Sequence, residues 1–203
     1  MKRSQVPEIM DDPNCPEALL ETGHRGLQRI HRLLGNVRIV SRAVTEDPFP
    51  VRRVMDIGCG RGGMLAELRR RHGVETIGID LKPSPGVLQL DATRDRLPEA
   101  DLAISVYMLH HLDESDVVKL VRNVRRSCRR FLILDVVRHP VPLWLYRVFV
   151  APLVPRVNAI DGARSVEKGF KAHELNALVR EAVNGEPFQH TVGPFHTYQV
   201  VDI

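Results

Sequence analysis

Apolar residues change their spacing along the chain, and the change separates a helical N-terminal region from an alternating region after it. Between residues 8 and 35 leucines and isoleucines recur at helical intervals after two proline-initiated turns, and residues 37–44 continue the pattern. After Pro48 short apolar runs alternate with helical segments. We therefore expect strands at residues 53–57, 75–80, 86–90, 101–107 and 130–137, with helices at 63–71 and 113–128.

This alternation predicts a parallel sheet that is covered by helices on both faces. Residues 131–134 are apolar without a break, as in a strand that is buried on both sides. Residues 138–169 interrupt the alternation with prolines and large apolar residues, and a helix is expected again at 171–183. Two last strands, at 188–192 and 195–201, flank a Gly-Pro turn and predict an antiparallel hairpin.

A glycine-rich string, residues 56–63, ends the first predicted strand and opens the next helix. Glycines there permit a tight turn and a close approach of backbone to ligand, and free amides at a helix start favour a carboxylate or phosphate. The string is ambiguous, because Gly58, Gly60 and Gly63 also satisfy the G-x-G-x-x-G fingerprint of dinucleotide-binding folds. The glycines alone therefore indicate a nucleotide-type cofactor without choosing between two classes.

Acidic residues at the ends of successive strands favour S-adenosylmethionine over NAD. Asp56 precedes the first glycine, where a carboxylate could face a cationic ligand, and Gly62 completes the tighter G-x-G-x-G spacing. Asp80 could accept the ribose hydroxyls, although it would serve NAD equally well. Asp91 could accept an adenine amino group, with the Ala92 amide on the ring. In a doubly wound fold, these ends share one rim with residues 105–109.

The ordered set resembles the class I S-adenosylmethionine-dependent methyltransferase family, most clearly over residues 51–137. Within it, Leu109-His110-His111-Leu112 is similar to the ubiquinone/menaquinone-type small-molecule subgroup. A weaker pattern at 161–175 resembles small bacterial members encoded among polyketide or lipid biosynthetic enzymes. Arg61 departs from the family, which often has a small hydroxyl residue there.

The resemblance implies an α/β, Rossmann-like, doubly wound sheet of seven strands, mostly parallel with an antiparallel last strand. We expect a single domain over residues 1–203, divided into an N-terminal helical cap (1–46), a cofactor-binding core (47–137), a lid insertion (138–169) and a closing helix and hairpin (170–203). The residues expected to bind S-adenosyl-L-methionine are Asp56, Gly58, Cys59, Gly60, Gly62, Asp80, Leu81, Asp91, Ala92, Ser105, Val106 and His110.

No catalytic residue stands out, and His110, His139 and Tyr146 are weak candidates because each also has a simple structural interpretation. Cys59 lies between two required glycines, which favours a spacer over a reactive thiol. The apolar residues of the lid, such as Trp144 and Phe149, could belong to the core or cover an acceptor.

Composition limits the other possibilities. The net charge of +4 comes mostly from arginines at 69–71 and 122–130, where a solvated helix face competes with a nucleic-acid surface. Aromatic content of 5% argues against nucleic acid as a partner, since no aromatics interleave with these arginines. Three scattered cysteines predict neither a disulfide nor a metal site. The longest apolar stretch, 141–154, is too short and too interrupted to span a membrane, so we expect a cytoplasmic protein.

We therefore predict an S-adenosylmethionine-dependent methyltransferase that O- or C-methylates a small, apolar, aromatic or polyketide-like acceptor. An RNA or DNA methyltransferase is the first alternative, and a NAD-binding oxidoreductase is the second. The identity of the acceptor, the methylated atom and the oligomeric state stay open at this point.

Overall fold

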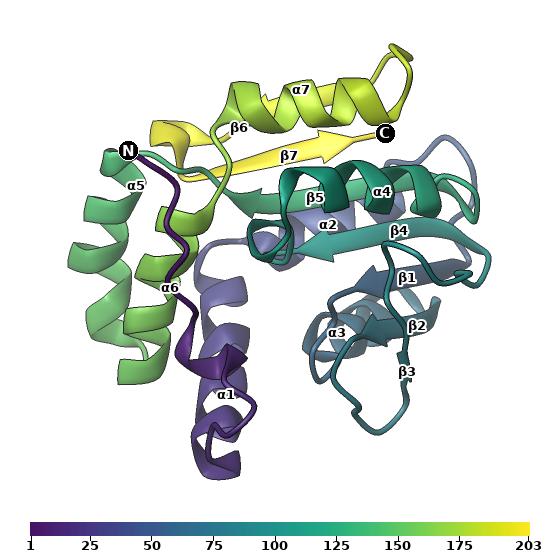
Figure 1. Ribbon diagram of the computed structural model, residues 1–203. Coiled ribbons are helices and arrows are strands. Elements are labelled where there is room, and N and C mark those ends of the chain that lie inside the picture. Colours follow the sequence, from purple (N-terminus) through teal and green to yellow (C-terminus); the bar gives the residue numbers. More distant parts are fainter.

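The computed structural model describes all 203 residues and contains one seven-stranded sheet in the order β3-β2-β1-β4-β5-β7-β6 (Figure 1). The first five strands are parallel, and β7 is inserted antiparallel between β5 and β6. The strands are β1 (Arg53–Ile57), β2 (Glu75–Asp80), β3 (Val87–Gln89), β4 (Ala100–Val106), β5 (Cys128–Val136), β6 (Gln189–Val192) and β7 (Tyr198–Asp202). The predicted doubly wound, Rossmann-like fold is confirmed.

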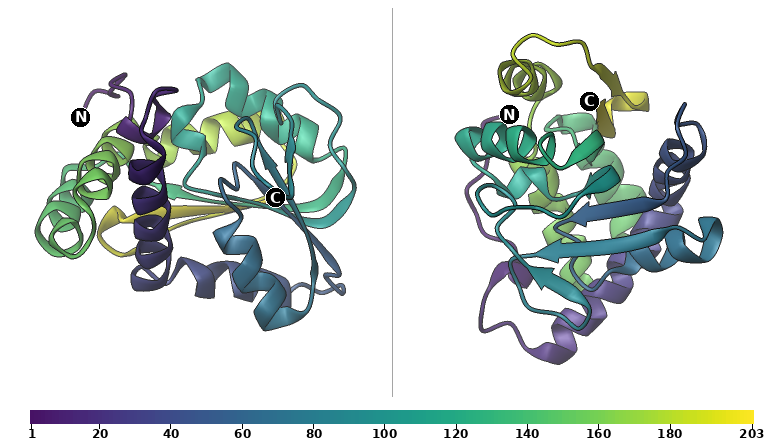
Figure 2. Two further views of the ribbon diagram at one scale, coloured as in Figure 1. Left: turned by 90° about the horizontal axis from the view of Figure 1, so that it is seen from below. Right: turned by 90° about the vertical axis from the view of Figure 1, so that its right-hand side faces the viewer.

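Helices cover both faces of the sheet, and further helices lie beyond the ends of its strands (Figure 2). The helices are α1 (Glu17–Leu33), α2 (Asn36–Thr45), α3 (Gly63–His72), α4 (Glu114–Val124), α5 (Pro140–Leu145), α6 (Arg156–Lys168) and α7 (Ala172–Ala182). Short helical turns are η1 (Ile9–Asp11), η2 (Leu109–His111), η3 (Tyr146–Val150), η4 (Ala151–Leu153) and η5 (Pro194–His196). The carboxyl ends of β1, β4 and β5 point toward α1, α5 and α6.

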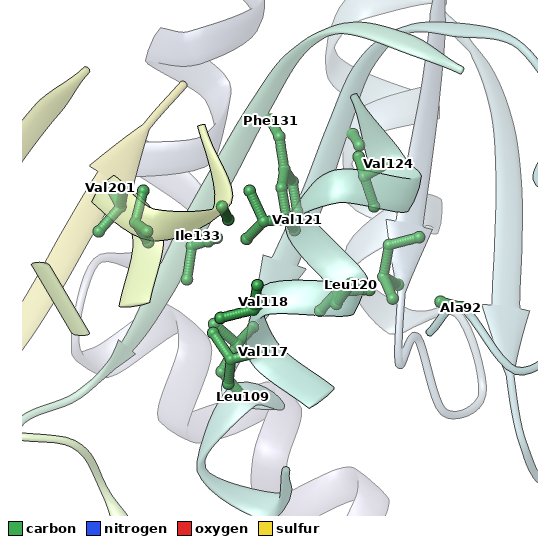
Figure 3. Packing of buried hydrophobic residues seen from close by; sticks show 14 of the residues in the cluster. Ala92, Leu109, Val117, Val118, Leu120, Val121, Val124, Phe131, Ile133 and Val201 are labelled. Atoms are coloured by element: carbon green, nitrogen blue, oxygen red, sulfur yellow. The ribbon is translucent and has the colours of Figure 1, made fainter. Parts of the chain in front are cut away.

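Strand β5 shows why the sheet needs apolar residues on both sides. Phe131 and Ile133 belong to the core cluster under α4 and α7, where Val121 packs nearby (Figure 3). The alternate residues Leu132 and Leu134 belong to a second cluster, under α2 and α3. All four are at most 3% exposed, so the uninterrupted apolar run follows from burial on two faces.

Two predicted boundaries were wrong for local reasons. The helix expected to reach residue 128 ends at Val124, because a turn follows in which Ser127 donates to the Val124 carbonyl, and β5 already starts at Cys128. The strand expected from Phe195 starts at Tyr198. Phe195 has a left-handed backbone, with φ of 53°, which is incompatible with an extended strand.

The interrupted region 138–169 is helical, and its α6 packs against α1 through small residues. The buried Asn158 side chain donates to the Gly23 carbonyl at 2.9 Å and lies directly over Gly26. A side chain at Gly26 would overlap the Asn158 amide, so this glycine sets how closely the two helices approach. None of the helices combines the length and apolar character that crossing a bilayer requires.

The residues before α1 cross this helical layer as an N-terminal strap (residues 3–11). Arg3 donates to the carbonyls of Lys168, His110 and Leu112, and its guanidinium lies 4.0 Å from the centre of the Phe170 ring. The Asp161 carboxylate accepts both backbone amides at the start of η1, at 2.7 and 3.0 Å. These contacts fasten the strap to α6 and to η2.

Substitution Gly26→Ala should destabilise the protein, because the new methyl group overlaps Asn158. Overpacking of this kind costs roughly 1–3 kcal/mol, which corresponds to a melting temperature lower by roughly 3–10 °C for a chain of this size. Differential scanning calorimetry measures the change. Arg25→Ala, on the exposed face of the same helix, is the control, and an equal effect from both variants would contradict the packing argument.

Candidate functional site

A cavity of about 950 Å³ lies beyond the carboxyl ends of β1, β2 and β4. Its glycine-turn half is lined by Ile57, Gly58, Gly60 and Arg61, by the end of β2 and by the segment after β3. Its strap half is lined by the N-terminal strap, α5, η3 and α6, while α1 contributes Leu20 and Leu27. Ligand pockets commonly measure roughly 300–1,000 Å³, so this cavity has room for a large ligand or for two.

The glycine turn depends on backbone conformations that favour glycine. Gly58, Gly60 and Gly62 have φ values of 73°, 54° and 71°. A side chain at Gly58 would also overlap Met108, which lines the cavity after β4. The turn is fixed to β2, because the Gly60 amide donates to Asp80 Oδ2 at 2.8 Å. Asp80 therefore shapes the turn as well as lining the cavity.

Asp56 is a buried acid beneath the turn. It is 3% exposed, and no protein donor forms a hydrogen bond with its carboxylate. Burial, and after it the charge of Asp80, raises the pKa of Asp56 to about 8. A carboxyl group in this state would be stabilised in its charged form by a nearby cation.

The predicted contacts beyond β2 and β3 are only partly free for a ligand. Asp80 Oδ1 accepts the Lys82 amide at 2.9 Å, and the adjacent Leu81 is 64% exposed at the cavity. Asp91 accepts the hydroxyl and amide of Thr93, at 2.6 and 3.0 Å, and the Thr93 hydroxyl in particular lowers the pKa of Asp91. Asp91 thus also stabilises its own turn, whereas the Ala92 amide has no protein acceptor.

Several predicted residues do not line the cavity: Asp56, Cys59, Gly62, Ser105, Val106 and His139. Burial raises the pKa of the Cys59 thiol to about 12, and the thiol packs against Gly78. After Val106 the chain turns through a left-handed Tyr107, with φ of 57°, so that Tyr107 and Met108 face the cavity instead of Ser105 and Val106. His139 accepts the Val141 amide as the N-cap of α5 and stacks on His196.

Of the weak catalytic candidates, His110 and Tyr146 line the cavity. The Tyr146 hydroxyl donates to the Asn158 carbonyl at 2.6 Å, and burial raises its pKa, so it stays protonated. His110 is 2% exposed, and its Nδ1 lies 2.8 Å from Asp135 Oδ1. The Asp135 carboxylate also accepts the backbone amide of His110. This leaves Nε2 of His110 without a hydrogen-bond partner.

The charges around His110 decide its protonation. Burial alone would lower the pKa of His110, but the carboxylates of Asp135 and Glu8 outweigh burial and raise it to about 9. Glu8 is on the strap, and its Oε1 lies 3.5 Å from His110 Nε2. The imidazole is therefore held between two carboxylates from segments far apart in the chain.

Further charged groups surround this array. The Lys168 ammonium lies 3.4 Å from both Glu8 and Asp11, and 3.0 Å from His111 Nδ1. Glu8, His110 and His111 bring potential metal-binding atoms within 4.8 Å of one another. Lys168 already supplies a cation to this cluster, so we assign no metal to it.

Four residues of the site were not among those predicted from the sequence: Glu8, Asp135, Asp161 and Lys168. Asp135 carried a signal, because an acid inside an otherwise apolar buried strand is uncommon without a partner. Glu8, Asp161 and Lys168 could not be recognised as site residues in this way. Glu8 is on the strap and the other two are on α6, and the contact between these two segments depends on tertiary structure. The sequence analysis thus named more of the residues that line the glycine-turn half than of those that line the strap half.

Comparison with known proteins identifies the family. Residues 26–178 match the family described as "Methyltransferase domain". The ubiquinone biosynthesis O-methyltransferase of Hahella chejuensis is 28% identical over 156 residues, covering 66% of this chain and 63% of that protein. The chain therefore spans slightly less than two thirds of this relative's length.

Solved structures share the fold at low identity. The plantazolicin methyltransferase BpumL in complex with SAH matches with a TM-score of 0.70 and 12% identity, covering 96% of this chain and 91% of that chain. Human N-acetylserotonin methyltransferase in complex with SAM matches with a TM-score of 0.59 and 17% identity, covering 88% and 53%. The chain belongs to the methyltransferase-domain family and has the class I fold of S-adenosylmethionine-dependent methyltransferases.

Proposed function

We propose that this protein transfers a methyl group from S-adenosylmethionine to an acidic hydroxyl of a small, apolar, aromatic or polyketide-like acceptor. The observation that carries the proposal is the single cavity in which the glycine-turn half continues into the strap half. Two ligands in such a cavity are held next to each other and shielded from water, which are the main requirements of methyl transfer. The similarity to ubiquinone O-methyltransferases supports an acceptor of this class.

The glycine-turn half has groups that suit the cofactor, which supplies a methyl group already activated on a sulfonium. Asp56 does not line the cavity, but it is a buried carboxyl without a partner beneath the glycine turn and suits the cofactor ammonium, directly or through water. Asp80 lines the cavity with lone pairs left for the ribose hydroxyls. The unpaired Ala92 amide suits the adenine edge, and Asp91 is placed beside it.

The strap half combines an apolar wall with one polar end. Pro142, Leu145 and Phe149 supply the wall, and Glu8 and His110 are at the polar end. An acceptor with an apolar body and one hydroxyl matches this division. Apolar contacts position the body, and the hydroxyl is placed toward His110, whose Nε2 has no hydrogen-bond partner.

The acidity of His110 favours a phenol or enol over an aliphatic alcohol. A phenol, with a pKa of about 10, is nearly as acidic as an imidazolium whose pKa the neighbouring carboxylates raise to about 9. A hydroxyl as weakly acidic as water, with a pKa of about 15.7, would give up its proton to such an imidazole far less readily. Methylation at carbon of an enolised acceptor needs the same proton transfer, and product analysis separates the two.

The alternatives from the sequence fit less well. The glycine spacing that is shared with NAD-binding folds no longer favours an oxidoreductase, because the chain matches the methyltransferase-domain family. A nucleic-acid substrate would have to enter a cavity crossed by the strap and lined by α1. The arginines at 69–71 and Arg122 are on helices that cover the sheet instead.

Asp80→Asn should weaken binding of S-adenosylhomocysteine. Losing the charge removes hydrogen bonds to a charged acceptor, worth about 1.5–3 kcal/mol, so we expect a dissociation constant roughly 10- to 100-fold higher. Isothermal titration calorimetry provides the measurement. Asp116→Asn, which changes a partly exposed acid of α4 outside the cavity, should bind normally. Unchanged affinity in the Asp80 variant would contradict its proposed role.

A panel of acceptors tests the proposed reaction directly. Phenols and quinols with apolar substituents should be methylated, and saturated alcohols of the same size should react at least ~100-fold more slowly, given the acidity difference. Mass spectrometry of the products identifies the methylated atom. Turnover restricted to nucleic acids or proteins would overturn the proposal.

A further inference from the structure

We propose that the helical segment of residues 140–153 docks on the surface of an anionic lipid bilayer, so that the acceptor enters the cavity from the lipid. The docking surface is the outer face of this segment, formed by Val141, Trp144, Val148, Phe149 and Leu153. The inference goes beyond the proposed function and rests on it only for the apolar nature of the acceptor.

Exposed large apolar side chains are concentrated in this one segment. The five residues of the outer face are among thirteen such residues in the whole protein, and they lie within residues 141–153. Trp144 and Phe149 are 59% and 57% exposed. Single apolar residues are normal on a protein surface, whereas a contiguous apolar patch marks an interaction site.

The helical geometry makes the outer face contiguous. Val141, Trp144 and Val148 are three and four residues apart, so they form one stripe along the helix. After α5 the chain continues into η3, a π-helical turn that is wider than an α-helical one. Phe149 therefore lies beside Trp144, with ring centres 5.8 Å apart in an edge-to-face arrangement. Figure 1 shows α5 at the outer edge of the molecule, with α6 between it and α1.

The turn η5 brings a further apolar side chain to this side of the protein. Phe195 is the most exposed of the large apolar residues, and its left-handed backbone is unfavourable for a bulky side chain. The next residue, His196, stacks on His139 at the start of α5, with ring centres 4.8 Å apart. Phe195 is thus held near the start of the outer face.

The charge of the segment suits an anionic partner. Residues 140–157 contain no acidic side chain, and their two cations, Arg147 and Arg156, are both exposed. Arg29 of α1 adds a third cation, because it donates to the carbonyl at the end of η4 at 3.2 Å. Arg147 pairs with Glu167 at 3.0 Å, but an ion pair exposed to this degree is weak and can be exchanged for a lipid phosphate.

The same residues favour a bilayer over a protein partner. Specific protein interfaces contain about one hydrogen bond per 100–200 Å². Residues 140–157 contain no Ser, Thr, Asn or Gln, and the Tyr146 hydroxyl is buried against the Asn158 carbonyl. Exposed aromatic and aliphatic side chains flanked by arginines are typical of a helix that lies in the membrane interface without crossing it.

The outer face adjoins the strap half of the cavity. The other side of the same helical segment lines the cavity through Pro142, Leu145 and Val150. Phe149 belongs to both, because it lines the cavity and is also more than half exposed. An apolar acceptor collects in a bilayer. Entry beside Phe149 would let the acceptor pass from lipid to cavity without crossing water.

The primary experiment uses Trp144, which is the only tryptophan of the chain, as a fluorescent probe. Vesicles of phosphatidylcholine and phosphatidylglycerol in equal amounts should shift its emission to shorter wavelength, because the indole leaves water. Lipids brominated in their acyl chains should quench it. Vesicles of phosphatidylcholine alone should bind more weakly, because they lack the anionic charge.

Two results of this experiment would overturn the proposal. The first is emission that stays unchanged with the anionic vesicles. The second is a shift without lipid that grows with protein concentration, which would assign the outer face to a second copy of the chain.

Co-sedimentation with the same anionic vesicles tests the residues. The double variant Trp144→Ser, Val148→Ser changes two side chains that do not line the cavity, and its lipid affinity should fall roughly tenfold or more. Arg156→Gln should lower the affinity roughly fivefold at low salt. The controls are Phe49→Ser, a similarly exposed aromatic before the amino end of β1, and Arg42→Gln on α2. Equal losses in variants and controls would contradict the assignment of the surface.

Turnover tests entry from the lipid. A phenol with a long alkyl chain, supplied in the anionic vesicles, should be methylated roughly tenfold more slowly by the double variant, in proportion to its lost lipid affinity. A small phenol dissolved in water should react as fast as with wild type. Equal losses with both acceptors would contradict entry from the bilayer. Because fluorescence and co-sedimentation need no acceptor, failure of the acceptor panel and failure of the docking proposal are separate results.

Discussion

Burial of the sheet on both faces is the constraint on which the rest of this structure depends. Strands β1, β4 and β5 have room for almost nothing but apolar side chains between α2 and α3 on one face and α4 and α7 on the other. Polar chemistry is therefore displaced to the carboxyl ends of the strands, where Asp56, Asp80 and His110 are found. The cavity lies at these strand ends, which the helices on the two faces of the sheet do not cover.

Asp135 is one exception to this rule, and the buried Asp56 of β1 is another. Asp135 is 2% exposed within β5, and hydrogen bonds or a charge partner stabilise such an acid in its charged form. His110 supplies both, through its ring and its amide. The pair fixes the start of η2 relative to β5, so the position of the ring depends on the sheet and not on a mobile loop.

The fold and the glycine-turn half of the cavity were predictable from the sequence, because each depends on local patterns. Apolar runs define the strands, and the glycines with Asp56 and Asp80 lie at the ends of strands adjacent in the chain. The strap half depends on contacts between Glu8 and Ser165, or Arg3 and Lys168, which are more than 150 residues apart. No spacing or periodicity connects such residues. The errors at Val124 and Phe195 arose from single turns, whose conformation hydrophobic patterning does not specify.

The strap also affects when the site can form during synthesis of the chain. Its residues emerge from the ribosome well before their partners Asp161, Ser165 and Lys168. At roughly 5–20 residues per second, the strap spends about 8–30 seconds without the surface that holds it. The residues of β1, β2 and the glycine turn are made early, whereas the polar end of the cavity can be completed only after α6 has been made. The residues of the half of the cavity suited to the cofactor are thus all available before those of the half suited to the acceptor.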